Sequence, residues 1–140
     1  MSKVAVVYFS MTGNTRAMAD AVADGVRNAG GTADEMECNE FNASMVNDYD
    51  AIAFGCPAMG AEQLEESSFE PMFAEVEGSL SNKKVGLFGS YGWGSGEWMQ
   101  IWSDRTEADG AKLVAEPVIA NYTPDGDAIV ACNDLGAKLC

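Results

Sequence analysis

Short apolar runs alternate with helical patterns along the whole chain, and this alternation constrains the fold more than any other feature. The runs predict strands, and the segments between them have the periodicity of amphipathic helices. The expected strands are Val4–Phe9, Thr32–Met36, Ala51–Gly55, Val85–Ser90 and Lys112–Ala120. Apolar strands separated by helices are typical of a doubly wound α/β fold, in which helices cover both faces of a five-stranded parallel sheet.

The helical patterns are separated by short connections that contain no linker or repeat. A Gly30-Gly31 pair is expected to end the first helix, because glycine adopts the left-handed conformation found at helix ends. The 140 residues therefore predict a single domain, residues 1–140. The predicted helices are Thr15–Asn28, Phe69–Val76, Glu97–Asp109 and Asp125–Lys138, with a short helical turn near Ala43–Val46.

The turn after the first strand is rich in hydroxyl groups and reads Ser10-Met11-Thr12-Gly13-Asn14-Thr15. A helix follows, so backbone N–H groups without intrahelical partners and the positive end of the helix dipole face this turn. Its hydroxyls can donate hydrogen bonds, its asparagine can cap the helix, and its glycine lets the backbone approach a ligand closely. These features favour a phosphate site, although such a cluster is also typical of an ordinary strand-to-helix turn.

Neither common nucleotide-binding loop is present. The chain lacks the Gly-x-x-x-x-Gly-Lys signature, and it lacks the Gly-x-Gly-x-x-Gly pattern of dinucleotide sites. One terminal phosphate is therefore the better interpretation of the turn.

Two further loops follow the third and fourth strands, at Cys56–Glu62 and Tyr91–Gly96. Ligands of such sheets bind beyond the carboxyl ends of the strands, so both loops are expected to meet the phosphate turn at one crevice. Trp93 offers a flat apolar face between glycines. It could instead cover the core, but its coincidence with the other two loops favours a planar ligand.

Acidic residues greatly outnumber basic ones, with 22 against 8 and a formal net charge of −14. This charge argues against nucleic acid and anionic membranes as partners and favours basic protein surfaces, although solubility alone also explains an acidic excess. Four acids crowd one segment in which a helix would suffer like-charge repulsion, which makes the segment a candidate for function. They are Glu62, Glu65, Glu66 and Glu70.

The chain contains no histidine, so the usual proton shuttle and the usual metal ligand are both missing. Its cysteines form no Cys-x-x-Cys pair and are expected to be packing residues, with neither zinc nor disulfides; they are Cys38, Cys56, Cys132 and Cys140. A secretory signal and an apolar run of membrane-spanning length are also absent from this sequence. A soluble, cytoplasmic protein is expected.

Three motifs together carry a family resemblance: Thr-Gly-Asn-Thr in the first turn, Gly-Cys-Pro-Ala-Met-Gly-x-Glu after the third strand, and Gly-Ser-Tyr-Gly-Trp-Gly-Ser-Gly-Glu-Trp after the fourth. In order and spacing, over essentially the whole chain, they resemble the short-chain flavodoxins of anaerobic bacteria. The resemblance implies a flavodoxin-like sheet with strand order 2-1-3-4-5 and FMN at the carboxyl edge of the strands.

The resemblance also implies residue roles. The phosphate turn would hold the FMN phosphate, Met59 and Trp93 would sandwich the isoalloxazine ring, and Glu62 would bind its pyrimidine edge. The Met59-Gly60 peptide would turn over on reduction, and Arg16, just past the turn, is expected to face solvent. The implied cofactor-binding residues are Ser10, Met11, Thr12, Gly13, Asn14, Thr15, Ala58, Met59, Gly60, Ala61, Glu62, Ser90, Tyr91, Gly92, Trp93 and Gly94.

The implied function is that of a low-potential one-electron carrier that shuttles FMN between semiquinone and hydroquinone. Basic-surfaced redox proteins would be its donors and acceptors, and it would act as a monomer. An alternative is a small FMN-dependent NAD(P)H reductase, but ring contacts on both faces would block hydride transfer. A phosphoacceptor signalling domain would need an aspartate where Cys56-Pro57 stand.

Overall fold

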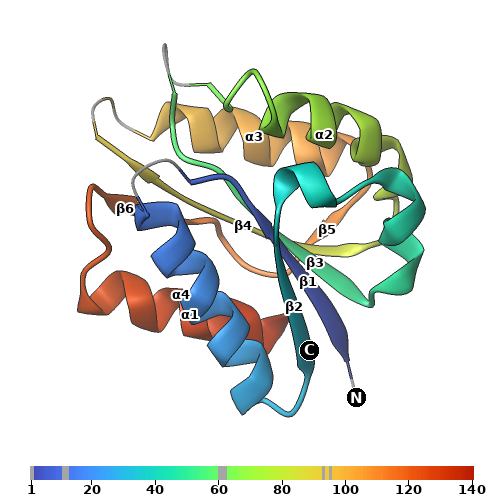
Figure 1. Ribbon diagram of the computed structural model, residues 1–140, viewed down its shortest axis with the longest axis horizontal. Coiled ribbons are helices and arrows are strands. Elements are labelled where there is room, and N and C mark those ends of the chain that lie inside the picture. The colour runs from blue at the N-terminus through green and yellow to red at the C-terminus, as the bar shows by residue number, and fades with distance from the viewer. Residues whose placement is uncertain (1, 11–12, 60–62, 93, 95) are drawn as a thin grey trace.

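The computed structural model describes residues 2–10, 13–59, 63–92, 94 and 96–140, and its helices and strands alternate along the chain (Figure 1). The strands are β1 (Lys3–Tyr8), β2 (Thr32–Glu37), β3 (Ala51–Gly55), β4 (Lys84–Tyr91), β5 (Lys112–Leu113) and β6 (Val118–Asn121). The α-helices are α1 (Asn14–Asn28), α2 (Phe69–Val76), α3 (Glu97–Ala108) and α4 (Gly126–Lys138). The short 3-10 helices are η1 (Cys38–Glu40), η2 (Ala43–Asp48) and η3 (Glu77–Ser79).

The sheet has the order β2-β1-β3-β4-β5, and all of its described strand pairs are parallel. This confirms the predicted topology. One expectation needs correction, because the predicted fifth strand Lys112–Ala120 is broken into β5 and β6, which both pair with β4. Pro117 lies in the break, where its missing N–H group cannot take part in a ladder.

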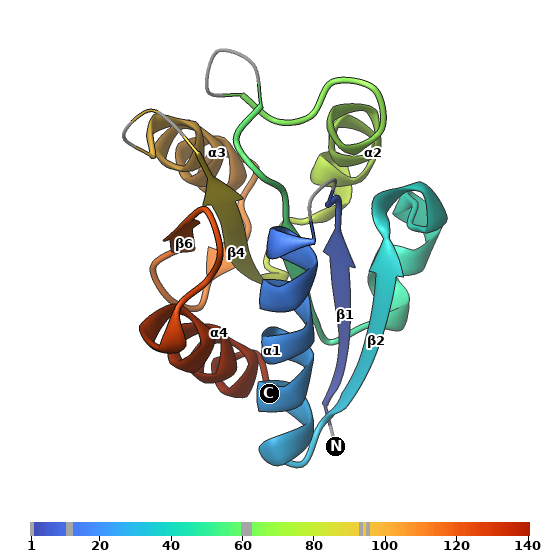
Figure 2. The same cartoon turned by 60° about the vertical axis from the view of Figure 1, so that its left-hand side comes forward.

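Helices cover both faces of the sheet (Figures 1 and 2). On one face α1 and α4 bury an aliphatic core that includes Met18, Val22 and Leu135. On the other face α2 and α3 bury an aromatic core, in which the rings of Phe69 and Phe73 meet the Trp102 ring edge-on with centroids 5.3 and 5.7 Å away. The two apolar faces of the sheet explain why its central strands are apolar throughout.

The first helix ends as the sequence predicts. Gly30 has φ +92°, its N–H group donates to the Arg27 carbonyl at 3.0 Å, and the Gly31 N–H group donates to the Val26 carbonyl at 2.9 Å. These are the two hydrogen bonds of a Schellman motif. They satisfy carbonyls at the end of α1 and direct the chain into β2.

Glu65, one of the crowded acids, lies in the segment before α2. Glu65 is buried, and its carboxylate accepts hydrogen bonds from the N–H groups of Ser67, Ser68 and Phe69 at 2.7 to 2.8 Å. It therefore caps the start of α2. Burial alone would raise the pKa of Glu65, but these backbone hydrogen bonds outweigh it and hold the pKa below its usual value.

A second acid of this segment also has a structural partner. Both carboxylate oxygens of Glu70 accept from the Arg105 guanidinium, at 2.7 and 2.8 Å, and Arg105 also pairs with Glu77 at 2.7 Å. This cluster ties α2 and η3 to α3. Glu65 and Glu70 thus have structural partners that offset the like-charge repulsion expected from the sequence.

The cysteines are free thiols, and Cys38, Cys56 and Cys132 are buried in the core, as predicted for packing residues. Burial raises the pKa of Cys38 to about 11 and that of Cys132 to about 12. Among the described residues, no helix has the length and apolar character needed to cross a membrane.

Replacing Glu65 with Gln is expected to lower the free energy of unfolding by about 2 kcal/mol, because the three N–H groups at the start of α2 lose a charged acceptor. The lowered pKa means that the carboxylate stabilises the fold above its unfolded pKa, and that this stability is lost as the pH falls through the folded-state value. The difference between wild type and Glu65→Gln should therefore shrink in acid. Urea unfolding followed by circular dichroism measures both effects.

The matched control is Glu66→Gln, since Glu66 is the exposed neighbour with the same charge. It should change the free energy of unfolding by less than about 0.5 kcal/mol. Equal losses in the two variants would contradict the capping role of Glu65.

Candidate functional site

The carboxyl ends of β1, β3 and β4 lie side by side at one edge of the sheet (Figure 2). The ladder extends past the ends of the strands. The Phe9 N–H group donates to the Gly55 carbonyl at 3.0 Å, and the Ala58 N–H group donates to the Ser90 carbonyl at 3.0 Å. The three segments predicted to form a site therefore leave the sheet as neighbours.

The turn after β1 is closed by its own hydroxyl group. The Ser10 Oγ accepts a hydrogen bond from the Gly13 N–H group at 3.0 Å, and Gly13 has φ +92°. The prediction that Asn14 caps the helix is wrong, because Gly13 takes the cap position in the left-handed conformation and Asn14 is already the first helical residue. Met11 and Thr12 lie outside the described residues.

The start of α1 differs from the starts of α2 and α4. Carboxylates cap α2 and α4, since Glu65 accepts from the Phe69 N–H group and Asp125 accepts from the Ala128 N–H group at 2.9 Å. The helix α3 begins at a left-handed glycine, as α1 does, but has Glu97 in its first turn. In the described part of the chain, α1 has no side-chain cap and no acid in its first turn. A Cβ built on Gly13 would meet no described atom within 4 Å. Among the described residues the space beside Gly13 is therefore open, which leaves room for an anion at the start of α1.

Two of the predicted site residues meet in the interior. The hydroxyl groups of Thr15 and Ser90 lie 3.0 Å apart, and the Ser90 N–H group donates to Thr15 Oγ1 at 3.4 Å. Both residues are buried. This contact links the first turn of α1 to the end of β4. Arg16, the next residue of the helix, is exposed as expected.

The loop after β3 folds back on itself. Met59 and Gln63 exchange two backbone hydrogen bonds, with the Met59 N–H group donating at 2.8 Å and the Gln63 N–H group donating to the Met59 carbonyl at 2.9 Å. Met59 is partly exposed at the tip. A turn of the peptide after Met59 would have to break the bond to Gln63. Gly60, Ala61 and Glu62 lie outside the described residues.

The loop after β4 begins against the aromatic core. The Tyr91 ring packs on Trp98 with centroids 5.5 Å apart, and Gly92 follows. Gly94 has φ +85°. Trp93, which the resemblance places against the cofactor ring, lies outside the described residues.

The ends of β3 and β4 are joined to α3 by one carbonyl group. The Trp98 indole N–H donates to the Cys56 carbonyl at 3.2 Å. A Cβ on Gly89 would lie 2.2 Å from that carbonyl oxygen, closer than atoms can approach. Only glycine at this position lets Cys56 lie close against β4. This contact sets the direction in which the loop carrying Met59 leaves the sheet.

Sequence reasoning missed Tyr122, which follows β6 at the same edge of the sheet. Its side chain is 61% exposed, its φ is +59°, and its N–H group donates to the Tyr91 carbonyl at 2.7 Å. Its ring flanks Gly92, because a Cβ built on Gly92 would lie 3.1 Å from Tyr122. The position of Tyr122 at the carboxyl end of the fifth strand was the signal that could have found it.

Replacing Gly89 with Ala is expected to lower the free energy of unfolding by about 3 kcal/mol or more, because the new methyl group forces the end of β3 away from β4. Urea unfolding measures the loss. Gly78→Ala is the matched control, since a Cβ there meets no described atom within 4 Å and this variant should stay within about 1 kcal/mol of wild type. Similar stability of both variants would refute the role of Gly89.

Comparison with known proteins gives one consistent result. The family model described as Flavodoxin matches residues 6–134. The chain is 46% identical to flavodoxin from Megasphaera elsdenii over 133 residues, 95% of each chain, and 40% identical to flavodoxin from Clostridium beijerinckii over 134 residues, 96% of each. The fold is similar to the solution structure of two-electron reduced Megasphaera elsdenii flavodoxin, with a TM-score of 0.89 over 97% of both chains.

Proposed function

Since the chain belongs to the flavodoxin family, we propose that its described site holds one non-covalently bound FMN and passes single electrons between redox proteins. Flavodoxins are FMN-binding electron carriers, and the chain is a carrier rather than an enzyme. The NAD(P)H reductase alternative is not favoured. When bound, FMN supplies the chemistry, because it accepts and releases electrons one at a time.

The uncapped start of α1 is the observation that carries the proposal. Its N–H groups would bind the FMN phosphate without a cationic side chain, and the positive end of the helix dipole would favour the negative charge. Ser10 would add a hydroxyl donor, because its oxygen accepts from Gly13 and no described residue accepts from its hydrogen. Thr12 and Thr15 would complete the hydroxyl set. The Thr15 hydroxyl would share its hydrogen bonding between the ligand and Ser90.

The loops after β3 and β4 would hold the flavin ring. Met59 and Trp93 would lie on its two faces, and Glu62 with the backbone near Gly92 would bind its pyrimidine edge. We add Tyr122 to this set as the residue that supports the Tyr91–Gly92 backbone, because it bonds to the Tyr91 carbonyl and flanks Gly92.

The charges near the site would set the potential through unequal binding of the redox states. A carboxylate near the ring opposes any added negative charge, so it lowers the potential of the more reducing couple. Glu65 and Glu70 contribute less to this effect than their charge suggests, because backbone N–H groups and Arg105 surround them. The carboxylates that would lower the potential of the bound flavin are therefore those of Glu62 and Glu66. Glu66 is exposed.

The acidic surface suits donors and acceptors with basic surfaces, and it opposes association between copies of this chain, so the carrier would act as a monomer. Free buried thiols fit a reducing compartment, and we assign the protein to the cytoplasm on that ground.

The purified protein is expected to be yellow, to show flavin absorption bands, and to release FMN when denatured. The ligand-free protein should take up one equivalent of FMN with quenching of flavin fluorescence. NADH alone should not reduce the bound flavin at enzymatic rates. A colourless protein that takes up no FMN would overturn the proposed function, and rapid reduction by NADH would favour the reductase.

Replacing Ser10 with Ala should weaken FMN binding about tenfold, because a hydroxyl donor to a charged phosphate is lost. Riboflavin lacks the phosphate, so its affinity should be unchanged. Fluorescence titration of ligand-free protein gives both dissociation constants. Ser79→Ala, an exposed serine in η3, is the control and should alter neither. Equal weakening of FMN and riboflavin would show that Ser10 acts only through the fold of its turn.

A further inference from the structure

The strand β6 lies at the edge of the sheet and, among the described residues, pairs only with β4. The Tyr122 N–H group faces β4, since it donates to the Tyr91 carbonyl. Backbone groups of alternate residues face the same side of a strand, so Val118 and Ala120 also face β4. The N–H and C=O groups of Ile119 and Asn121 therefore point away from the sheet, where a further strand could pair with them.

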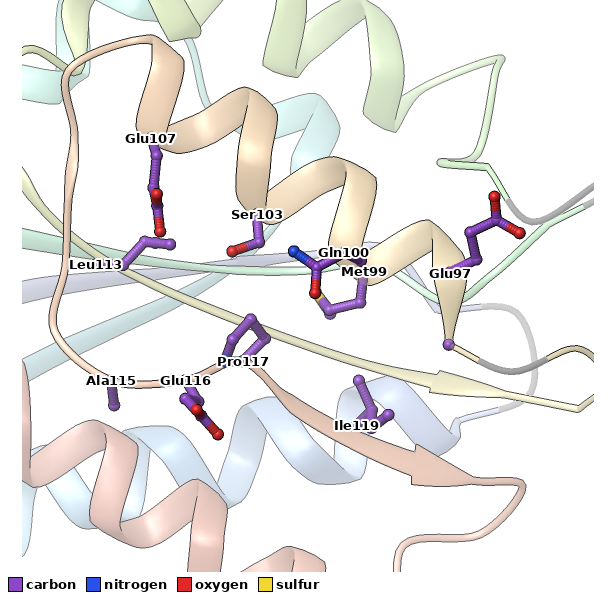
Figure 3. Close-up of a pocket in the computed structure, with 11 residues that line it drawn as sticks. Glu97, Met99, Gln100, Ser103, Glu107, Leu113, Ala115, Glu116, Pro117 and Ile119 are labelled. Carbon is purple, nitrogen blue, oxygen red and sulfur yellow. The ribbon is translucent and has the colours of Figure 1, made fainter.

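One face of this edge is hollowed by a groove of about 830 Å³ between α3 and the β5–β6 segment (Figure 3). Residues spaced along one side of α3, from Glu97 to Glu107, form one wall of the groove. Ten residues of helix span about 15 Å, which matches about four or five residues of extended chain. The opposite wall contains Leu113, Pro117 and Ile119.

Ser103 in this groove has no hydrogen-bonding partner for its hydroxyl among the described residues. The residue is only 8% exposed, and Figure 3 shows its oxygen directed toward the gap between α3 and the β5–β6 segment. A hydroxyl group at this place can donate a hydrogen bond to a polar group in the groove or accept one from it.

The other face of the edge is hollowed as well. A second groove of about 530 Å³ lies between β6 and α4, and Asp125, Asp127 and Ala128 form its α4 side. Glu116, Pro117 and Ile119 line both grooves. The exposed edge of β6 thus lies between the two grooves, one on each face of the sheet.

Both grooves are acidic. Glu97, Glu107 and Glu116 line the first, and neither groove has a lysine or arginine among its described lining residues. The carboxylates of Glu107 and Glu116 form no ion pair or hydrogen bond within the described part of the chain. Such charges attract a basic ligand, and they repel the same edge of a second copy of this protein.

We propose that the β6 edge binds an extended, lysine- or arginine-bearing segment of a redox-partner protein by strand addition. Successive side chains of an added strand point to opposite faces, so they would enter the two grooves in turn while its backbone pairs with Ile119 and Asn121. The redox nature of the partner rests on the proposed carrier function. Tyr122 and Gly96, at the ends of β6 and of the first groove, place the added strand beside the cofactor loops.

The FMN-loaded protein provides the test, with a capped hexapeptide of alternating lysine and valine as the probe. Titration followed by NMR should give saturable binding at low salt. Hydrogen exchange of the Ile119 and Asn121 amides should slow when the peptide binds. The Ala120 amide is the internal reference, because it already faces β4 and its exchange should not change. Absence of binding, or binding without protection of Ile119 and Asn121, overturns the proposal.

Two control peptides separate the contributions of backbone and charge. The same peptide N-methylated at every residue keeps its charges, but its methyl groups block strand pairing and it cannot donate to the carbonyls of β6, so it should lose the protection. A peptide of alternating glutamate and valine should not bind. If the N-methylated peptide binds as tightly as the probe, attraction between charges alone explains the binding and strand addition is refuted.

A pair of double variants locates the binding. Glu107→Gln with Glu116→Gln should weaken the probe roughly tenfold. Asp48→Asn with Asp134→Asn removes the same charge from exposed positions outside both grooves and should leave the affinity unchanged at constant salt. Equal weakening by both pairs refutes the site. The flavin spectrum of each sample tests the carrier function independently, so failure of the edge proposal and failure of FMN binding are distinguishable.

Discussion

At the end of β3 the Cys56 carbonyl accepts the Trp98 indole N–H, and Gly89 of β4 leaves room for that carbonyl to approach. The candidate site depends on this contact. It fixes the end of β3 against both β4 and α3, so the loop that carries Met59 leaves the sheet in a set direction. The Thr15–Ser90 hydrogen bond does the same between α1 and β4. These buried contacts fix the points at which the ligand-binding loops leave the sheet, and so they position the residues that the loops carry.

The acidic residues of this chain divide by their surroundings into groups with different consequences. Glu65 and Asp125 cap helices, and Glu70 and Glu77 pair with Arg105, so their charges are largely compensated. Glu107 and Glu116 have no such partner in the described part of the chain. Net charge alone would treat these groups alike. Carboxylates without a hydrogen-bonding or ion-pair partner attract a basic protein, and they oppose negative charge on a bound cofactor. Carboxylates with such partners do so less, because the partners offset their charge.

The sequence predicts most of this architecture because most of its signals are local. The bounds of α2 and β3 agree with the structure, since the apolar spacing and the flanking residues are enough to define them. The break of the fifth strand depends on where the chain can pair with β4 again, which is a long-range property. The burial of Glu65 depends on the direction of a loop relative to α2. The role of Tyr122 depends on a left-handed backbone conformation, which sequence rarely indicates for tyrosine.

An open sheet edge beside a redox site has to reconcile two requirements. Unpaired N–H and C=O groups invite pairing with any extended chain, including another copy of the protein. Carboxylates on both faces of the β6 edge oppose such self-pairing, because two copies would bring like charges together in the same grooves. A basic partner meets attraction instead, within a screening distance of about 8 Å at physiological salt. Since β6 has only four residues, the backbone contribution stays small, and a complex held by few hydrogen bonds and screened charges dissociates quickly. Rapid dissociation is what an electron carrier needs between its donor and its acceptor.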